Sequence, residues 1–522
     1  MRLRPFASCL ARHAWALTVT LSATLPVAPS LTAQSYSSAH PTPVAPNGPF
    51  DRTYEPRNAS TGADSSGFPT SWLQAYGNAA RNASFPNASS APTRSDSVVS
   101  WRYAEARAWP LENDAPFGII GTDTASALTT ITQWLGNALN VTPVGGMVYA
   151  ASADQFIYAI NAKTGQLVWR TSPVGSTYMG NPLVWERLVY VTAGTVGFNY
   201  SNVQAFARTG SAVRGEGVAF NGVYALDRAT GALCWHFDTK GDAMPTPAID
   251  AGRLFFSTGA GNVHALDARS GKELWKAHVG GMGNMSSPAV ADGRVFMGMA
   301  SPAVLFALDG STGRVLWRGT IPLAANTGMG DVSPAVLGGI VVTDAVAAAD
   351  TTASPVTMDF VVRAFDAATG RPLWTRSLGR GKKPPSYKGG VPMIHDGTVY
   401  VGSPVTNTFS ALDLRSGRVK WTWQIPHPGA AGSGRGPATW HDGTLYVATV
   451  GSVFALNPET GALLGSRHFG GRFGIMSPSI VGGTMYLGNS WDWVIASPIA
   501  PVRQTVPNVG AAPSRPEGMR KP

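Results

Sequence analysis

The sequence predicts an all-β protein, an eight-bladed β-propeller of four-stranded antiparallel blades, closed by pairing of an N-terminal strand with the last blade. Three observations support this prediction: a repeated turn motif, short apolar strands around each copy, and an unmatched strand near each end of the repeats. The motif reads Ala, an apolar residue, Asp or Asn, two free positions, Thr or Ser, Gly, three free positions and Trp. The complete copies end at Trp169, Trp235, Trp275, Trp317, Trp374 and Trp421. A seventh copy carries Gly465 in place of Trp. Self-similarity at a spacing of about 40 to 50 residues is typical of stacked blades or a solenoid.

Each copy of the motif predicts the outer half of a blade, as the copy that ends at Trp275 illustrates. Its opening segment is a strand, and Asp267 caps the tight turn that follows while Gly271 takes a positive φ. The run to Trp275 is the returning strand, and its indole is large enough to fill the wedge against a neighbouring blade. An alternating apolar strand such as Val399–Val401 comes earlier in the repeat. The first strand opens with a step such as Ser333-Pro334, where Pro is tolerated.

The count of repeats predicts how the ring closes. Seven repeats carry the turn motif, and an eighth begins at Ser477 and ends near Ser497 without its fourth strand. The segment Val98–Tyr103 belongs to no repeat and has the pattern of the missing outer strand. Pairing the two ends completes the eighth blade and removes both open sheet edges.

The chain divides into four predicted regions. Residues 1–33 have the pattern of a secretory signal, in which arginines precede an apolar stretch and cleavage follows Ala33. Residues 34–67 form a flexible lead-in, residues 68–500 the propeller and residues 501–522 a disordered tail. No apolar stretch is long enough to span a bilayer. We therefore expect a soluble protein, periplasmic or secreted, with no transmembrane anchor.

Composition narrows the classes of function. Only 13% of the 522 residues are charged, and the formal net charge is +10, or +7 without the signal residues Arg2, Arg4 and Arg12. Because carboxylates are few, acid adds little self-repulsion, which suits an acid-stable protein. The basic residues are scattered along a chain predicted to be exported, which argues against nucleic-acid binding. After signal removal, Cys234 alone remains, so no intramolecular disulfide forms, and we expect this residue to be a small buried hydrophobe.

The candidate site residues lie in the segment just before the first strand of each blade, which we call the leading loop of that blade. These loops are expected to cross the rim of the central channel. Of the residues that they bring together, the candidates for the site are Asp242, Asp331, Tyr387, Lys388, Arg435 and Arg472. A funnel with cations and a polarisable lining suits a small anionic substrate.

Asp331 is the strongest catalytic candidate. Glycines flank Met329 just before Asp331, so the backbone can dip into the channel. A carboxylate there, near Lys388 or Arg435, would hold a water molecule as general base. The alternatives are that Asp331 and Asp242 cap turns and that the cations are solvated charges at the rim.

The segment Ser71–Asn82, with Trp72 and Tyr76-Gly77, resembles the opening segment of quinoprotein-type propellers. The Ala-Leu-Asp-x-x-Thr-Gly-x-x-x-Trp repeat is similar to that of the pyrroloquinoline quinone (PQQ) propeller superfamily. The resemblance covers about residues 70 to 500 and implies the propeller fold. Within the superfamily are dehydrogenases, assembly scaffolds and hydrolases, so the resemblance leaves the function open.

Two of these classes fit the sequence less well. Quinoprotein alcohol dehydrogenases bind PQQ and Ca²⁺, usually beneath a pair of adjacent cysteines, and this chain has neither that pair nor the segments that supply the metal ligands. The segment Arg214–Gly217 resembles one of theirs but lacks the preceding Glu. The outer-membrane assembly scaffold is a shorter lipoprotein, and Cys9 precedes the apolar stretch of the signal, where it cannot be lipidated.

The tetrathionate hydrolases of sulfur-oxidising bacteria resemble the chain best, in size, signal, low carboxylate content and lack of haem or quinone motifs. The resemblance implies hydrolysis of tetrathionate to thiosulfate, sulfate and sulfur without a cofactor, with Asp331 activating the water. The sulfonate ends would be held by Lys388, Arg435 and Arg472, with Tyr387 and Asp242 completing the substrate site. Two long insertions, residues 195–221 and 343–360, are candidate contacts for a homodimer.

Overall fold

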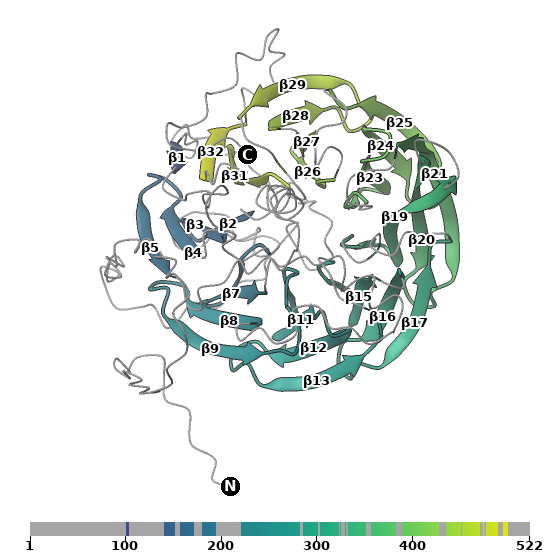
Figure 1. Cartoon of the computed structure of the whole chain (residues 1–522). Coiled ribbons are helices and arrows are strands. Elements are labelled where there is room, and N and C mark those ends of the chain that lie inside the picture. The colour runs from purple at the N-terminus through teal and green to yellow at the C-terminus, as the bar shows by residue number, and fades with distance from the viewer. Residues whose placement is uncertain are drawn as a thin grey trace, which may run out of the picture.

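The computed structural model of the protein describes residues 101–103, 140–151, 157–171, 180–194, 221–281, 286–300, 303–322, 324, 329, 332–350, 357–382, 389–426, 435–449, 451–469, 473, 477–488 and 494–499. These residues form a ring of eight sheets, each of four antiparallel strands (Figure 1). The first strand of each blade lies nearest the axis of the ring, and the fourth lies at its circumference. The predicted eight-bladed β-propeller is confirmed.

The strands follow one another from the axis outward within each blade. In the first four blades they are β2 (Asn140–Val144), β3 (Met147–Ala151), β4 (Ile157–Asn161), β5 (Leu167–Thr171), β6 (Leu183–Trp185), β7 (Leu188–Ala193), β8 (Gly222–Asp227), β9 (Leu233–Asp238), β10 (Ala248–Asp250), β11 (Arg253–Ser257), β12 (Asn262–Asp267), β13 (Glu273–His278), β14 (Ala289–Ala291), β15 (Arg294–Met299), β16 (Val304–Asp309) and β17 (Val315–Thr320).

In the last four blades they are β18 (Ala335–Leu337), β19 (Ile340–Asp350), β20 (Thr357–Asp366), β21 (Pro372–Lys382), β22 (Met393–His395), β23 (Thr398–Ser403), β24 (Thr408–Asp413), β25 (Val419–Gln424), β26 (Ala438–His441), β27 (Thr444–Thr449), β28 (Ser452–Leu456), β29 (Leu463–His468), β30 (Ser479–Val481), β31 (Thr484–Gly488), β32 (Val494–Pro498) and, as the outer strand of the eighth blade, β1 (Trp101–Tyr103).

The ring closes as the sequence predicts, because β1 pairs antiparallel with β32. Trp101 lies opposite Ala496 in this pairing. In the fourth blade the motif residues Ala307 and Trp317 are paired in the same way. The N-terminal strand therefore supplies the eighth blade with a Trp at the register position that the repeat motif fills in the other blades.

The Asp of the motif caps its turn by accepting several hydrogen bonds. Asp309 Oδ1 accepts from the amides of Ser311 at 3.0 Å and Thr312 at 2.9 Å, and from their hydroxyls at 2.6 and 3.0 Å. Gly313 then takes a φ of 74°. The hydrogen bonds from Ser311 and Thr312 lower the pKa of Asp309 to about 2. The cap thus keeps its charge well into the acid range.

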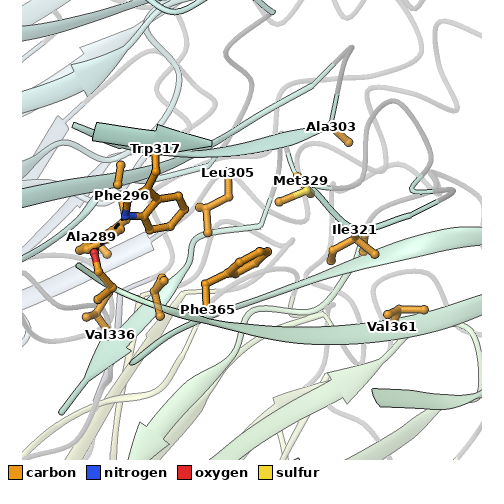
Figure 2. Close-up of a cluster of buried hydrophobic side chains, with 14 of the residues drawn as sticks. Ala289, Phe296, Ala303, Leu305, Trp317, Ile321, Met329, Val336, Val361 and Phe365 are labelled. Carbon is orange, nitrogen blue, oxygen red and sulfur yellow. Dashed lines mark hydrogen bonds between the residues drawn. The ribbon is translucent and has the colours of Figure 1, made fainter. Parts of the chain in front are cut away.

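The Trp of each motif packs on the turn of the next blade. Trp317 Nε1 donates to the carbonyl oxygen of Ala367 at 3.1 Å, and its ring lies 5.9 Å from that of Phe365. A Cβ on Gly370 would lie 2.6 Å from the Trp317 ring. Figure 2 shows Trp317 between Phe296 of the fourth blade and Phe365 of the fifth. The other pairs of this kind are Trp169–Gly231, Trp235–Gly271, Trp275–Gly313, Trp374–Gly417 and Trp421–Gly461.

This contact explains why the seventh copy of the motif ends in Gly465. Its neighbour, the eighth blade, takes its outer strand from β1 and so has no motif turn between its third and fourth strands. A Trp at this position would have no turn glycine to cover. The missing Trp follows from the way the ring closes.

Two expectations are corrected by the structure. Of the insertion 343–360, residues 343–350 and 357–360 are not loop but extend β19 and β20, which pair from Ile340–Asp366 out to Asp350–Thr357. The pairing of the two strands continues without a turn, so the hairpin lengthens. Cys234 is half-buried rather than buried, because it lies on the outermost strand β9. Of the insertion 195–221, residues 195–220 lie outside the described residues.

We predict that Gly370→Ala lowers the free energy of unfolding by about 3 kcal/mol, since it adds left-handed strain of about 1 kcal/mol to a clash with Trp317. Gly397→Ala is the matched control, because Gly397 has a φ of 68° and nothing within 4 Å of the added Cβ. The control is expected to lose about 1 kcal/mol. Urea unfolding measures both losses, and equal losses would show that the Trp317 contact is unimportant.

Candidate functional site

The structure describes two of the six candidate residues, Asp242 and Arg435. Asp331, Tyr387, Lys388 and Arg472 lie outside the described residues. Asp242 precedes the third blade and Arg435 the seventh, so these two candidates belong to blades on opposite sides of the ring (Figure 1).

Arg435 lies in the leading loop of the seventh blade, shortly before β26, and is only 7% exposed. It is therefore not a solvated charge at the rim, which was one of the two interpretations of this residue. A buried guanidinium requires anionic or polar groups nearby.

Asp242 is fully buried in the leading loop of the third blade. Its carbonyl oxygen accepts a hydrogen bond from the amide of Gly259 at 2.9 Å. A Cβ on Gly194 of the second blade would lie 2.6 Å from the Cβ of Asp242. Asp242 is thus enclosed between the second and third blades, and its backbone helps to hold the leading loop.

A further carboxyl group, Asp344 on β19 of the fifth blade, was missed by the sequence reasoning. Asp344 is fully buried. A Cβ added to Gly389 would overlap Asp344 Oδ1 and would lie 3.0 Å from Val332 Cγ2. Val332 ends the leading loop of the fifth blade, and Gly389 lies in that of the sixth. The carboxyl of Asp344 therefore lies where these two leading loops approach each other.

The repeats show why a carboxyl group is unusual at this position. The residues that align with Asp344 in the second strands of the other blades are small and uncharged: Ala151, Thr192, Ser257, Gly298, Gly402, Ala448 and Gly488. Thr192 and Gly298 lie against the leading loop of the following blade. Thr192 Oγ1 donates to the carbonyl oxygen of Pro245 at 2.9 Å, and a Cβ on Gly298 would overlap the carbonyl oxygen of Met329. An Asp fits here because Gly389 has no side chain.

The environment of Asp344 opposes its ionisation. Burial raises the pKa of Asp344 well above its ordinary value, while the amide of Gly390 and the positive charge of Arg435 lower it in part. Within the described part of the chain, neither carboxylate oxygen makes a hydrogen bond of ordinary geometry. Burial is the largest of these influences, so the environment of Asp344 favours a protonated carboxyl group.

The described residues do not offer a ligand set for a metal. Among them, no three His, Cys, Asp or Glu side chains converge on one point. Nor does the same part of the chain include a helix long and apolar enough to cross a bilayer.

Comparison with known proteins agrees with the fold. The family described as "Outer membrane protein assembly factor BamB" matches residues 101–213, 219–350 and 343–489. The crystal structure of BamB from Moraxella catarrhalis superposes with a TM-score of 0.50 at 18% sequence identity, covering 69% of this chain and 96% of that one. At this level of identity the similarity shows a shared fold and nothing about function. The fold and the repeats define the class: a PQQ-type β-propeller.

Two relatives with higher sequence identity show which family within this class the chain belongs to. Tetrathionate hydrolase of Acidithiobacillus ferrooxidans is 49% identical over 464 residues, which cover 89% of this chain and 93% of that protein. Tetrathionate hydrolase of Acidianus ambivalens is 34% identical over 399 residues, which cover 72% and 73% of the two chains. The chain belongs to the tetrathionate hydrolase family.

We predict that Asp344→Asn changes how stability depends on pH. The folded-state pKa of Asp344 is raised above its unfolded value of about 3.9, so its contribution is fully present below about pH 4 and is lost as pH rises through the folded pKa. The melting temperature of Asp344→Asn should therefore rise relative to wild type as pH increases from about 4 to 8.

The control for this prediction is Asp359→Asn. Asp359 lies on β20 of the same blade and accepts a hydrogen bond from Ser377 Oγ at 2.6 Å near the surface. Its melting temperature, measured over the same pH range, shows what the loss of a carboxyl group near the surface of this blade does by itself. A pH dependence of Asp344→Asn that runs parallel to that of wild type would show that Asp344 ionises as easily when folded as when unfolded.

Proposed function

We propose that this protein is an exported hydrolase that cleaves tetrathionate with water to thiosulfate, sulfate and sulfur. The observation that supports this most is the 49% identity, over 89% of the chain, to a protein named tetrathionate hydrolase. In the overall reaction an S–S bond breaks, the oxygen of water ends in sulfate and protons are released. We expect the reaction to need no quinone, haem or metal.

Asp331 is proposed as the general base that takes a proton from the attacking water. Its chain neighbours Val332 and Ser333 are buried. Asp331 itself lies outside the described residues, so its role rests on the sequence. In acid, nearby cations would favour its ionised form.

The proposed substrate site uses the positive charges of Lys388, Arg435 and Arg472 to hold the two sulfonate ends of the dianion. Burial of Arg435 supports its part in this set, because a desolvated guanidinium binds an anion more strongly than one in water. Lys388 directly precedes Gly389, which packs against Asp344. Tyr387 and Asp242 complete the proposed substrate residues, with Asp242 acting from the opposite side of the ring. The insertions at 195–221 and 343–360 remain proposed contacts for a homodimer.

Export is proposed from the N-terminal sequence. The arginines before an apolar stretch in residues 1–33 have the pattern of a secretory signal. Cleavage after Ala33 would deliver the propeller to the periplasm or the medium.

We predict that Asp331→Asn lowers kcat for tetrathionate hydrolysis about 100-fold or more, the usual contribution of a general base. The amide has nearly the shape of the carboxylate but cannot accept the proton. Release of thiosulfate from purified protein, without added electron acceptor, measures the loss. Asp359→Asn serves as the control and should retain wild-type kcat.

Two results would contradict the proposed function. One is alcohol-dependent dye reduction that appears only when PQQ and Ca²⁺ are added, with no consumption of tetrathionate. The other is recovery of outer-membrane assembly proteins with this chain in the absence of either activity. The first result would indicate a dehydrogenase, and the second would indicate an assembly scaffold.

We further predict that the mature protein begins at Gln34, because the signal is cleaved after Ala33. N-terminal sequencing of protein recovered from the periplasm or the medium measures this directly. A full-length chain retained in the cytoplasm would contradict the proposal of export.

A further inference from the structure

We propose that Asp344 is a positioning residue that sets the spacing between the leading loops of the fifth and sixth blades, and with it the placement of Asp331 relative to Lys388. This inference rests on the proposed function, because it takes Asp331 as the general base and Lys388 as a ligand of a sulfonate group. The other seven blades have a small uncharged residue at the position of Asp344, so the propeller repeat itself does not require a carboxyl group there.

The two leading loops meet at Gly389 of the sixth blade. A Cβ added to Gly389 would lie 3.0 Å from Val332 Cγ2, in the leading loop of the fifth blade, and 3.2 Å from Asp344 Cγ. The same Cβ would overlap Asp344 Oδ1. The side chains of Asp344 and Val332 are both fully buried, so together they fill the space beside this glycine. A larger side chain at position 389, or a smaller one at position 344, would change the distance between the loops.

The leading loop of the fifth blade is fixed on its other side by the fourth blade. Ser286 Oγ donates a hydrogen bond to the carbonyl oxygen of Val332 at 2.7 Å and accepts one from the amide of Gly298 at 3.0 Å. The carbonyl oxygen of Met329 packs so closely on Gly298 that a Cβ there would overlap it. Asp331 therefore has an anchored residue on each side of it in the chain, Met329 before it and Val332 after it.

The leading loop of the sixth blade has fewer side chains to hold it. Gly389 and Gly390 are buried and carry no side chain, so the position of this segment depends on the groups that pack against it. Asp344 is such a group, because it comes from β19 of the fifth blade and lies against Gly389. Its carboxyl group therefore acts as a spacer between the anchored loop of the fifth blade and the glycine segment of the sixth.

The chain itself carries this spacing to the proposed site residues. Asp331 is bonded to Val332, on one side of the contact. Lys388 is bonded to Gly389, on the other side, and consecutive Cα atoms are about 3.8 Å apart. Asp331 and Lys388 lie outside the described residues, so the inference uses the described residue to which each is bonded. Because a catalytic group and a ligand must be placed to within about 0.5 Å, a shift between the two loops would impair both binding and proton transfer.

The form of Asp344 that fills this space is the neutral acid. Burial raises the pKa of Asp344 well above its ordinary value, because a charge that is removed from water is costly. The size of the carboxyl group, and not a negative charge, is therefore what separates the loops. A neutral side chain of the same size should hold them equally well, whereas a smaller one should not.

The first experiment measures kcat and KM for tetrathionate with the purified full-length protein at about pH 4, where Asp344 is neutral. Asp344→Ala empties the space between the loops, and Gly389→Ala overfills it. In each variant we expect KM to rise and kcat to fall about tenfold, because Lys388 and Asp331 are both displaced. Asp344→Asn keeps the size of the neutral acid, so both constants should stay within about twofold of those of wild type.

The double variant Asp344→Ala/Gly389→Ala tests the spacing directly. The methyl group added at position 389 enters the space that the carboxyl group leaves, so the loops regain a spacing close to that of wild type. The kcat/KM of the double variant should exceed that of Gly389→Ala at least about fivefold.

Ser257→Ala is the matched control. Ser257 is fully buried at the same position of the third blade, and the leading loop of the following blade contains no candidate residue. This variant also removes a buried polar side chain from a second strand, but it should keep the kcat and KM of wild type.

Several results would overturn the inference. Wild-type kcat and KM in Gly389→Ala would show that the spacing does not matter, as would a double variant no more active than Gly389→Ala. A loss in Asp344→Asn as large as in Asp344→Ala would show that the charge of the carboxylate, and not its size, is required. A lower melting temperature of Asp344→Ala with an unchanged KM would show a purely structural role. If Asp344→Ala does not fold, Gly389→Ala and Asp344→Asn still decide, because one should lose activity and the other should not.

The inference can be tested even if the proposed function fails. Should wild type consume no tetrathionate, inorganic sulfate serves as the anion probe, and its binding is measured as the rise in melting temperature. This rise should be smaller in Gly389→Ala than in wild type and should recover in the double variant. An equal rise in all three proteins, or no rise in wild type, would overturn the role of Asp344 separately from the question of hydrolysis.

Discussion

The contact between the Trp of one blade and the turn glycine of the next is the interaction on which the rest of this structure depends. It binds neighbouring sheets through an apolar ring and, in most blades, through an indole hydrogen bond to a backbone carbonyl, as Trp317 and Ala367 show. The turn must hold a left-handed glycine that approaches the ring, and the Asp cap fixes that turn. The regular spacing of Asp, Gly and Trp in the sequence therefore reflects the same packing requirement in successive blades of the ring.

With the blades fixed in this way, a second strand can lie close to the leading loop of the following blade, as Thr192 and Pro245 show. The other blades place a small uncharged residue at the position of Asp344, and at Gly298 the loop leaves no room for a larger one. The fifth blade differs, since the carboxyl group of Asp344 occupies the space that a side chain at Gly389 would need. A rigid scaffold can thus hold one buried acid among loops that carry the proposed substrate-binding residues.

Much of the fold could be predicted from the sequence, because the residues of the motif form the turns and the contacts between neighbouring blades. The closure of the ring was also predictable, since the eighth repeat lacked a strand and Val98–Tyr103 had no other partner. The extension of β19 and β20 was missed, because an Ala-rich insertion gives a weak strand pattern.

Of the site, only the residue types in the leading loops could be predicted. Burial of Arg435 and Asp242 could not, since charged residues are usually exposed. The carboxylate of Asp344 becomes unusual only when the eight second strands are aligned.

The pairing of β1 with β32 has a consequence for how the protein is made. The outer strand of the last blade is among the earliest described parts of the chain to be synthesised, while its partner is among the last. Seven blades can assemble in order as the polypeptide emerges, but the eighth must wait for both ends. Such a distant pairing is slow to form, because the ends of a long chain must first meet. Until then the incomplete ring exposes unpaired strand edges, so the pairing of β1 with β32 is the step at which this molecule becomes protected from aggregation.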